Sequence, residues 1–123
     1  MANLINWFEI PVVNLDRAVN FYSAVFSYSS MHIMDLGDLK MAIFPMEGDG
    51  VGGALCMHES YIPGRDGAVI YLNANPDLSI PLSKIESSGG KVIMQKKQIS
   101  PEVGYMALFL DSEGNRVALH SLK

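Results

Sequence analysis

The side chains best suited to chemistry fall in short stretches that resemble strands, and several stand two positions apart. Glu9 follows Trp7 at this spacing, and His58 follows Cys56. Residues two apart on a strand project from the same face of a sheet, so each pair could share one site. A carboxylate and an imidazole can move protons, and a thiolate can act as a nucleophile beside a base. Same-strand positions give a thiol and an imidazole poor hydrogen-bond geometry, so we do not expect a nucleophilic Cys56–His58 pair.

The 123-residue chain is predicted to be one folded domain. Apolar residues make up 49% of it and charged residues 18%, which is typical of globular rather than disordered proteins. The formal net charge of −4 and the pI near 5.2 argue against binding to nucleic acid or to an anionic membrane. No stretch approaches the roughly 20 apolar residues that a membrane-spanning helix needs.

The single cysteine, Cys56, excludes an intramolecular disulfide and fits a reducing compartment. The segment from Met1 to Glu9 lacks the basic and long apolar parts of a signal peptide. A cytoplasmic location is therefore expected.

The first half of the chain is predicted to form a strand, a helix and three further strands. Leu4–Val13 is rich in β-branched and aromatic residues, as strands are. Asn14 is a suitable N-cap for a helix whose apolar residues recur at helical spacing up to Phe26. The three extended runs that follow are Tyr28–Leu36, Leu39–Pro45 and Val51–His58.

The second half repeats this order. Ala68–Ala74 is predicted to be a strand, and the apolar residues from Leu78 to Ile85 are spaced for a helix. That helix should end before Gly89, and Pro81 should make it start late or kink. The remaining strands are predicted at Lys91–Lys96, Gly104–Asp111 and Asn115–Leu122.

The duplication is also visible in the residues themselves. MAIF at Met41–Phe44 returns as MALF at Met106–Phe109, and Ala54-Leu55 returns as Ala118-Leu119, in the same order and roughly 64 residues later. The sequence therefore predicts an α+β fold in which residues 1–123 form a single domain. Two βαβββ modules, at residues 1–60 and 66–123, would enclose a cleft between their curved sheets.

Asn6–Tyr22 (NWFEIPVVNLDRAVNFY) resembles the first strand and helix of the vicinal-oxygen-chelate superfamily, which includes glyoxalase I, bleomycin-resistance proteins and extradiol dioxygenases. Asp111–Ser121 (DSEGNRVALHS) is similar to the closing hairpin of that superfamily, and Arg65–Leu72 to the start of its second module. The resemblance covers nearly the whole chain. It implies paired modules that form a curved, barrel-like mixed sheet around a cleft, and it implies a symmetric homodimer.

In this superfamily the cleft commonly holds a divalent metal on His, Gln or Glu side chains of the first and last strand of each module. By position these ligands would fall on Trp7, on Ala54 or Cys56, on Val69 or Tyr71, and on Ala118. Trp, Ala and Val offer no donor atom to such a cation. We therefore expect neither the usual metal nor another cofactor.

The resemblance further implies that Glu9 faces the cleft beside Trp7 and that His120 faces it beside Ala118. The carboxylate and the imidazole could then meet as the polar centre of the pocket. Their role would be catalytic, as an acid–base pair, or structural, as a buried hydrogen-bonded pair. A shifted metal site of Glu9, His58 and His120 is a further alternative. The predicted ligand-binding residues are Trp7, Cys56, Tyr71 and Ala118.

The resemblance and the missing metal ligands together leave three alternative functions. The first is a protein of the bleomycin-resistance type that binds a small organic molecule without a metal. The second is a metal-independent isomerase or lyase that uses Glu9 and His120. The third is a metal-dependent lactoylglutathione lyase or dioxygenase, which the missing ligands place last. The sequence does not separate a binding protein from an enzyme, because both need a concave, mostly apolar pocket with a few polar anchors.

Overall fold

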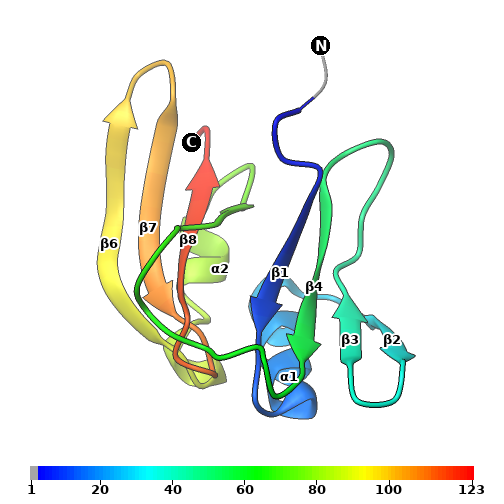
Figure 1. Cartoon of the computed structure of the whole chain (residues 1–123). Coiled ribbons are helices and arrows are strands. Elements are labelled where there is room, and N and C mark those ends of the chain that lie inside the picture. Colours follow the sequence, from blue (N-terminus) through cyan, green and yellow to red (C-terminus); the bar gives the residue numbers. More distant parts are fainter. Residues whose placement is uncertain (1–2) are drawn as a thin grey trace.

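The computed structural model describes residues 3–123, which form two halves with the same order of elements (Figure 1). The first half contains β1 (Trp7–Pro11), α1 (Leu15–Phe26), β2 (His32–Asp35), β3 (Lys40–Ile43) and β4 (Gly52–Met57). The second half contains β5 (Tyr71–Asn73), α2 (Ser79–Leu82), the short 3-10 helix η1 (Glu86–Ser88), β6 (Lys91–Ser100), β7 (Gly104–Leu110) and β8 (Arg116–Ser121). Within residues 3–123, no helix is long and apolar enough to cross a membrane.

Each half folds into a four-stranded sheet with the same topology. Sheet A has the order β1-β4-β3-β2, and sheet B has the order β5-β8-β7-β6. In both sheets the first strand of the half pairs in parallel with the last, and the other pairs are antiparallel. The predicted α+β fold of paired βαβββ modules is confirmed, as two separate mixed sheets.

Helix α1 begins where the sequence predicts. The side chain of Asn14 accepts a hydrogen bond from the backbone N–H of Arg17 at 3.0 Å, which caps the first turn. The helix ends at Ser27, whose backbone is left-handed (φ 60°) and whose N–H donates to the carbonyl of Ser23. The apolar stripe between these caps is buried, as its spacing predicts.

The corresponding segment of the second half is much less helical. Helix α2 has four residues, since Pro81 lies within it and cannot donate a backbone hydrogen bond. The apolar pattern is nevertheless correct, because Leu78 and Ile85 are fully buried. The segment closes at Gly89, whose φ of 107° suits glycine.

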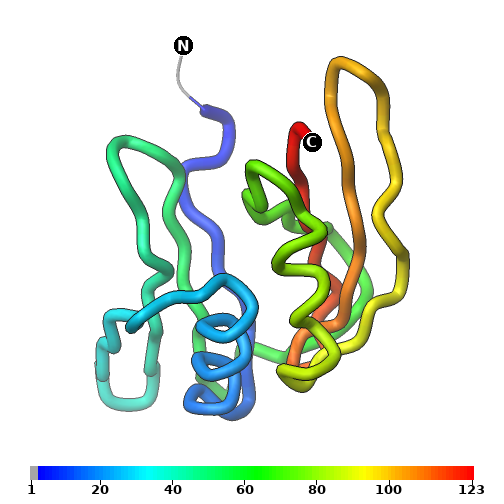
Figure 2. The backbone as a smooth tube through the Cα atoms, turned by 180° about the vertical axis from the view of Figure 1, so that it is seen from behind, coloured from blue at the N-terminus to red at the C-terminus, as the bar shows by residue number. Residues whose placement is uncertain are grey.

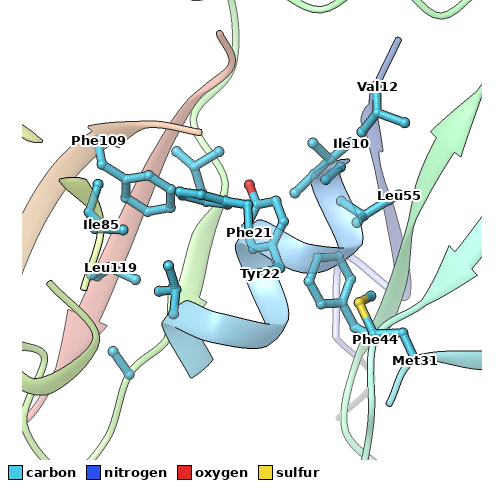
Figure 3. Close-up of a cluster of buried hydrophobic side chains, with 14 of the residues drawn as sticks. Ile10, Val12, Phe21, Tyr22, Met31, Phe44, Leu55, Ile85, Phe109 and Leu119 are labelled. Atoms are coloured by element: carbon cyan, nitrogen blue, oxygen red, sulfur yellow. The ribbon is translucent and has the colours of Figure 1, made fainter. Parts of the chain in front are cut away.

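Helix α1 packs against both sheets and lies between them (Figure 3). The ring of Phe21 lies 6.0 Å from that of Phe109 on β7, between centroids, and Tyr22 packs edge-on against Phe44, just after β3, at 5.3 Å. Figure 2 shows α1 and α2 next to each other. One continuous core therefore joins the two halves through α1.

We call the sheet sides that contact α1 the inner faces and the opposite sides the outer faces. Alternation along the strands places Trp7 and Glu9 on the outer face of sheet A, and Tyr71 and His120 on that of sheet B. Because α1 packs against the inner faces, each outer face is the side of its sheet that lies away from this helix.

Candidate functional site

Glu9 is the polar centre of the outer face of sheet A. It lies on β1 opposite Ala54 of β4. The hydroxyl of Tyr61, in the segment after β4, donates to Oε1 of Glu9 at 2.7 Å, and the indole N–H of Trp7 donates to Oε2 at 3.2 Å. The surrounding apolar cluster has three buried members, Met41, Ala54 and Cys56. The carboxylate of Glu9 thus lies beside an apolar cluster on this face.

The hydrogen bond from Tyr61 is the main reason why the pKa of Glu9 lies below its ordinary value of 4.5. Partial burial acts in the opposite direction, and further bonds from Trp7 and Cys56 add to the lowering. Glu9 is therefore ionised at neutral pH. It can hold a cation or accept a hydrogen bond, but its lowered pKa makes it a weak proton acceptor.

Cys56 is fully buried, and burial, followed by the charge of Glu9, raises its pKa to about 12. The thiol is protonated at neutral pH and is not a nucleophile. The imidazole of His58 has other partners. Its Nδ1 accepts the backbone N–H of Ser60 at 2.9 Å, and its Nε2 lies 3.6 Å from a carboxylate oxygen of Asp38.

The outer face of sheet B carries the second group of predicted site residues. Tyr71 lies opposite Ala118, and its hydroxyl contacts the sulfur of Met106 at 3.8 Å. Nε2 of His120 lies 2.6 Å from the carbonyl oxygen of Val103. A carbonyl only accepts hydrogen bonds, so this nitrogen carries a proton and ties His120 to the turn between β6 and β7.

The predicted site residues therefore form two groups in the chain. One group consists of Trp7, Glu9 and Cys56 on sheet A, and the other of Tyr71, Ala118 and His120 on sheet B. Glu9 is hydrogen-bonded to Trp7 and Tyr61, and His120 to the carbonyl of Val103, and no hydrogen bond joins Glu9 to His120 within residues 3–123. The position of α1 between the sheets is the physical reason.

Tyr61 was missed by the sequence analysis, although it forms the shortest hydrogen bond to Glu9. It lies in the segment between the halves, which follows no strand or helix pattern. Its own backbone N–H donates to the carbonyl of His58 at 2.9 Å, and the segment is then held by a long-range bond from the N–H of Gly64 to the side-chain oxygen of Asn115 at 3.0 Å. No local signal marks such a contact.

The residues at the superfamily's metal-ligand positions do not fit a metal ion. Trp7, Ala54 and Ala118 have no suitable donor atom, and the thiol of Cys56 is buried and protonated. The alternative set of Glu9, His58 and His120 is not assembled either, because each has separate partners. In the part of the chain that the structure describes, no three His, Cys, Asp or Glu side chains form a group that could hold a metal.

No protein-family model matches the chain. A glyoxylase-like domain-containing protein from Didymella fabae is 27% identical to it over 117 residues, which cover 94% of this chain and 91% of that relative.

Three solved structures have a similar fold. A mutant glyoxalase I from Zea mays superposes with a TM-score of 0.70 at 16% identity over 94% of this chain, which spans 45% of the maize protein. A glyoxalase/bleomycin resistance protein from Albidiferax ferrireducens gives a TM-score of 0.67 at 13% identity, covering 97% of this chain and 98% of its own. An antibiotic binding protein from a Streptomyces species gives 0.67 at 18% identity, covering 98% and 96%.

Proposed function

This chain has the fold of the glyoxalase/bleomycin-resistance/dioxygenase superfamily, and on that premise we propose that it binds a small organic molecule on its outer sheet faces without the superfamily's usual metal. The observation that carries the proposal is the ionised carboxylate of Glu9, set in an apolar surface beside Trp7. The side chain of Trp7 is 43% exposed, so its ring is available to a ligand. The similarity of the fold to that of an antibiotic binding protein supports the proposal.

The chemistry of this face indicates the class of ligand. A flat ring such as that of Trp7 packs against flat or apolar molecules and attracts cations. The carboxylate of Glu9 has lone pairs beyond those used by Trp7 and Tyr61, and it favours a positively charged or hydrogen-bond-donating group. We infer a largely apolar, flat molecule with one cationic group.

A second copy of the chain would complete the binding site. Each outer face exposes large apolar side chains, including Trp7 and Met34 on sheet A and Tyr71 and Met94 on sheet B. Apolar surface of this kind is typical of contact sites. In a two-fold dimer, sheet A of each copy can lie against sheet B of the other, which forms two equivalent clefts. Glu9 of one copy and His120 of the other would then line the same cleft.

Binding is favoured over acid–base catalysis by the state of these two groups. The pKa of Glu9 is lowered, which weakens it as a base, and the Nε2 proton of His120 is held by the carbonyl of Val103. An isomerase or lyase reaction would also need Glu9 from one copy of the chain and His120 from the other.

A cytoplasmic location remains a prediction, supported by the buried, unpaired thiol of Cys56.

Trp7 is the one tryptophan of the chain, so its fluorescence reports on this face directly. The test titrates benzamidine, a flat cation, against benzamide and benzoate, which have the same ring but no positive charge. We expect benzamidine to change the emission of Trp7 with an affinity about tenfold higher than that of benzamide.

Glu9→Gln should remove that difference, because it removes the charge and keeps the shape. The matched control is Glu47→Gln, which removes an exposed carboxylate from the loop between β3 and β4 of the same half. Equal affinity for the three probes, or an unchanged preference in Glu9→Gln, would contradict the proposal.

A further inference from the structure

A cavity of about 450 Å³ opens at one end of sheet A, and it shares Tyr61 with the surroundings of Glu9. It lies where β1 and β4 end and where the turn between β2 and β3 approaches them. Its apolar wall includes the buried side chain of Val12 and the partly buried Met57 and Tyr61. Ile62 stands beside it with 75% of its surface exposed. The cavity is therefore large enough for a small molecule and mostly apolar on one side.

His58 supplies a polar group to the cavity in one fixed tautomer. Because Nδ1 accepts the N–H of Ser60 at 2.9 Å, the neutral ring must carry its proton on Nε2. The nearest acidic oxygen, on Asp38, lies 3.6 Å from Nε2, which is longer than a good N–H···O hydrogen bond. The side chain of Asp38 is 88% exposed and that of His58 only 22%. A largely buried donor thus lacks a short acceptor among residues 3–123.

The same tautomer determines what His58 can do. Its Nδ1 lone pair is already used by Ser60, so the neutral ring has no free lone pair to accept a proton from a substrate. It can only donate a hydrogen bond from Nε2. The charged side chains that line the cavity are the carboxylates of Asp38 and Glu59 and the ammonium group of Lys40, so two negative charges outnumber one positive charge and an anionic ligand is disfavoured.

We propose that this cavity is a second binding site, for a small neutral molecule with a carbonyl group. The carbonyl oxygen accepts the Nε2 proton of His58, and the apolar part of the molecule packs against Val12, Met57 and Tyr61. A carbonyl oxygen fits because it accepts hydrogen bonds and carries no net charge. Tyr61 faces His58 edge-on, with ring centroids 6.0 Å apart, and provides an aromatic wall.

The test compares acetophenone with ethylbenzene, which has the same ring and lacks the carbonyl. Protein labelled with ¹⁵N in its histidines is titrated with each probe, and the imidazole nitrogen signals are followed by NMR. Free protein should show the Nε2-protonated tautomer at His58. Acetophenone should shift the Nε2 signal of His58 saturably, with an affinity about tenfold higher than that of ethylbenzene.

His58→Phe keeps a flat ring and removes the Nε2–H donor. It should therefore lower the affinity for acetophenone to that for ethylbenzene. The methyl NMR signals of the two probes measure both affinities in this variant. Ser60→Ala is the matched control, because it keeps the backbone N–H that fixes the tautomer, and it should bind acetophenone as the wild type does. An Nδ1-protonated tautomer at His58, equal binding of the two probes, or full binding of acetophenone by His58→Phe would overturn the proposal.

Discussion

The carboxylate of Glu113, at the turn between β7 and β8, accepts hydrogen bonds from the guanidinium group of Arg17 on α1 at 2.7 and 3.0 Å. It also accepts the backbone N–H groups of Val13 and Asn14 at 2.9 Å each. A side chain of the second half therefore caps the N-terminus of the helix of the first half, where a negative charge is favourable. This contact joins the two halves in addition to the apolar core.

Glu113→Gln should destabilise the fold by about 2 kcal/mol at pH 7, because it removes a buried charge that several donors surround. Burial of Glu113 tends to raise its pKa, but the hydrogen bonds from Arg17 and from the backbone of Asn14 and Val13 outweigh it and hold the pKa at about 2. A carboxylate with a depressed pKa stabilises the fold above its unfolded pKa, near 4.5. The difference between variant and wild type should therefore shrink as the pH falls from 4.5 toward 2 in urea denaturation. A difference that does not depend on pH would contradict this interpretation.

Tyr22→Phe should lower the free energy of unfolding by about 1.5 kcal/mol. The hydroxyl of Tyr22 is fully buried and donates to the carboxylate of Asp111 at 2.8 Å, so the variant leaves that carboxylate short of a partner. Tyr28→Phe, which removes a hydroxyl from the same aromatic cluster, is the control and should change stability by less than about 0.5 kcal/mol. Chemical denaturation at pH 7 measures both, and equal effects of the two variants would argue against the buried bond.

Gly90→Ala should destabilise the fold by about 2 kcal/mol. A β-carbon at this position would come within 2.5 Å of the carbonyl oxygen of Leu110 and 2.7 Å of the ring of Phe21. Gly64→Ala is the control, because a β-carbon there meets no atom within 4 Å. Thermal denaturation should separate the two variants by several degrees. A Gly90→Ala protein as stable as Gly64→Ala would contradict the close approach of Gly90 to Leu110 and Phe21.

The binding of benzamidine should be insensitive to pH between 8 and 5 and should weaken below about pH 4.5. The reason is that the pKa of Glu9 lies below 4.5, so its carboxylate remains ionised until the solution is acidic. Trp7 fluorescence measures the affinity at each pH, and circular dichroism at the same pH values separates loss of binding from unfolding. A fall in affinity near pH 6 to 7 would point to a histidine instead of Glu9.

Leu108→Lys should convert a dimer into a monomer. Leu108 lies on the outer face of sheet B opposite Ala118, where a second copy would cover it. Ile80→Lys adds the same charge at a side chain that is 56% exposed on α2, away from both outer faces, and should leave the dimer intact. Light scattering after gel filtration should give twice the 13.5 kDa chain mass for wild type and for Ile80→Lys. A monomeric wild-type protein would contradict the shared cleft.

Local signals were enough to predict the helix and the order of the strands. The cap at Asn14 and the apolar stripe of α1 depend only on neighbouring residues, and the structure confirms both. Strand bounds were less predictable because they depend on pairing partners. The first strand was expected from Leu4, but β1 begins at Trp7, and Leu4 is 99% exposed. In contrast, β6 extends past its expected end at Lys96 to Ser100, because its pairing with β7 continues through bulges.

The candidate site was predictable only within each sheet. Alternation along a strand correctly placed Glu9 beside Trp7, because that relationship is local. The distance between Glu9 and His120 depends on how the two halves pack, and that packing is set by long-range contacts of Phe21 and Tyr22 with the second half. No residue pattern near Glu9 or His120 carries this information.

Because α1 packs against both sheets, neither copy of the sequence repeat is a folding unit on its own. A fragment ending near residue 60 would leave Phe21 in water, and a fragment beginning near residue 66 would uncover Phe109. Neither half has a complete hydrophobic core of its own. The two modules therefore depend on each other for a complete hydrophobic core. A substitution at the contact between Phe21 and Phe109 in one module requires a compensating substitution in the other.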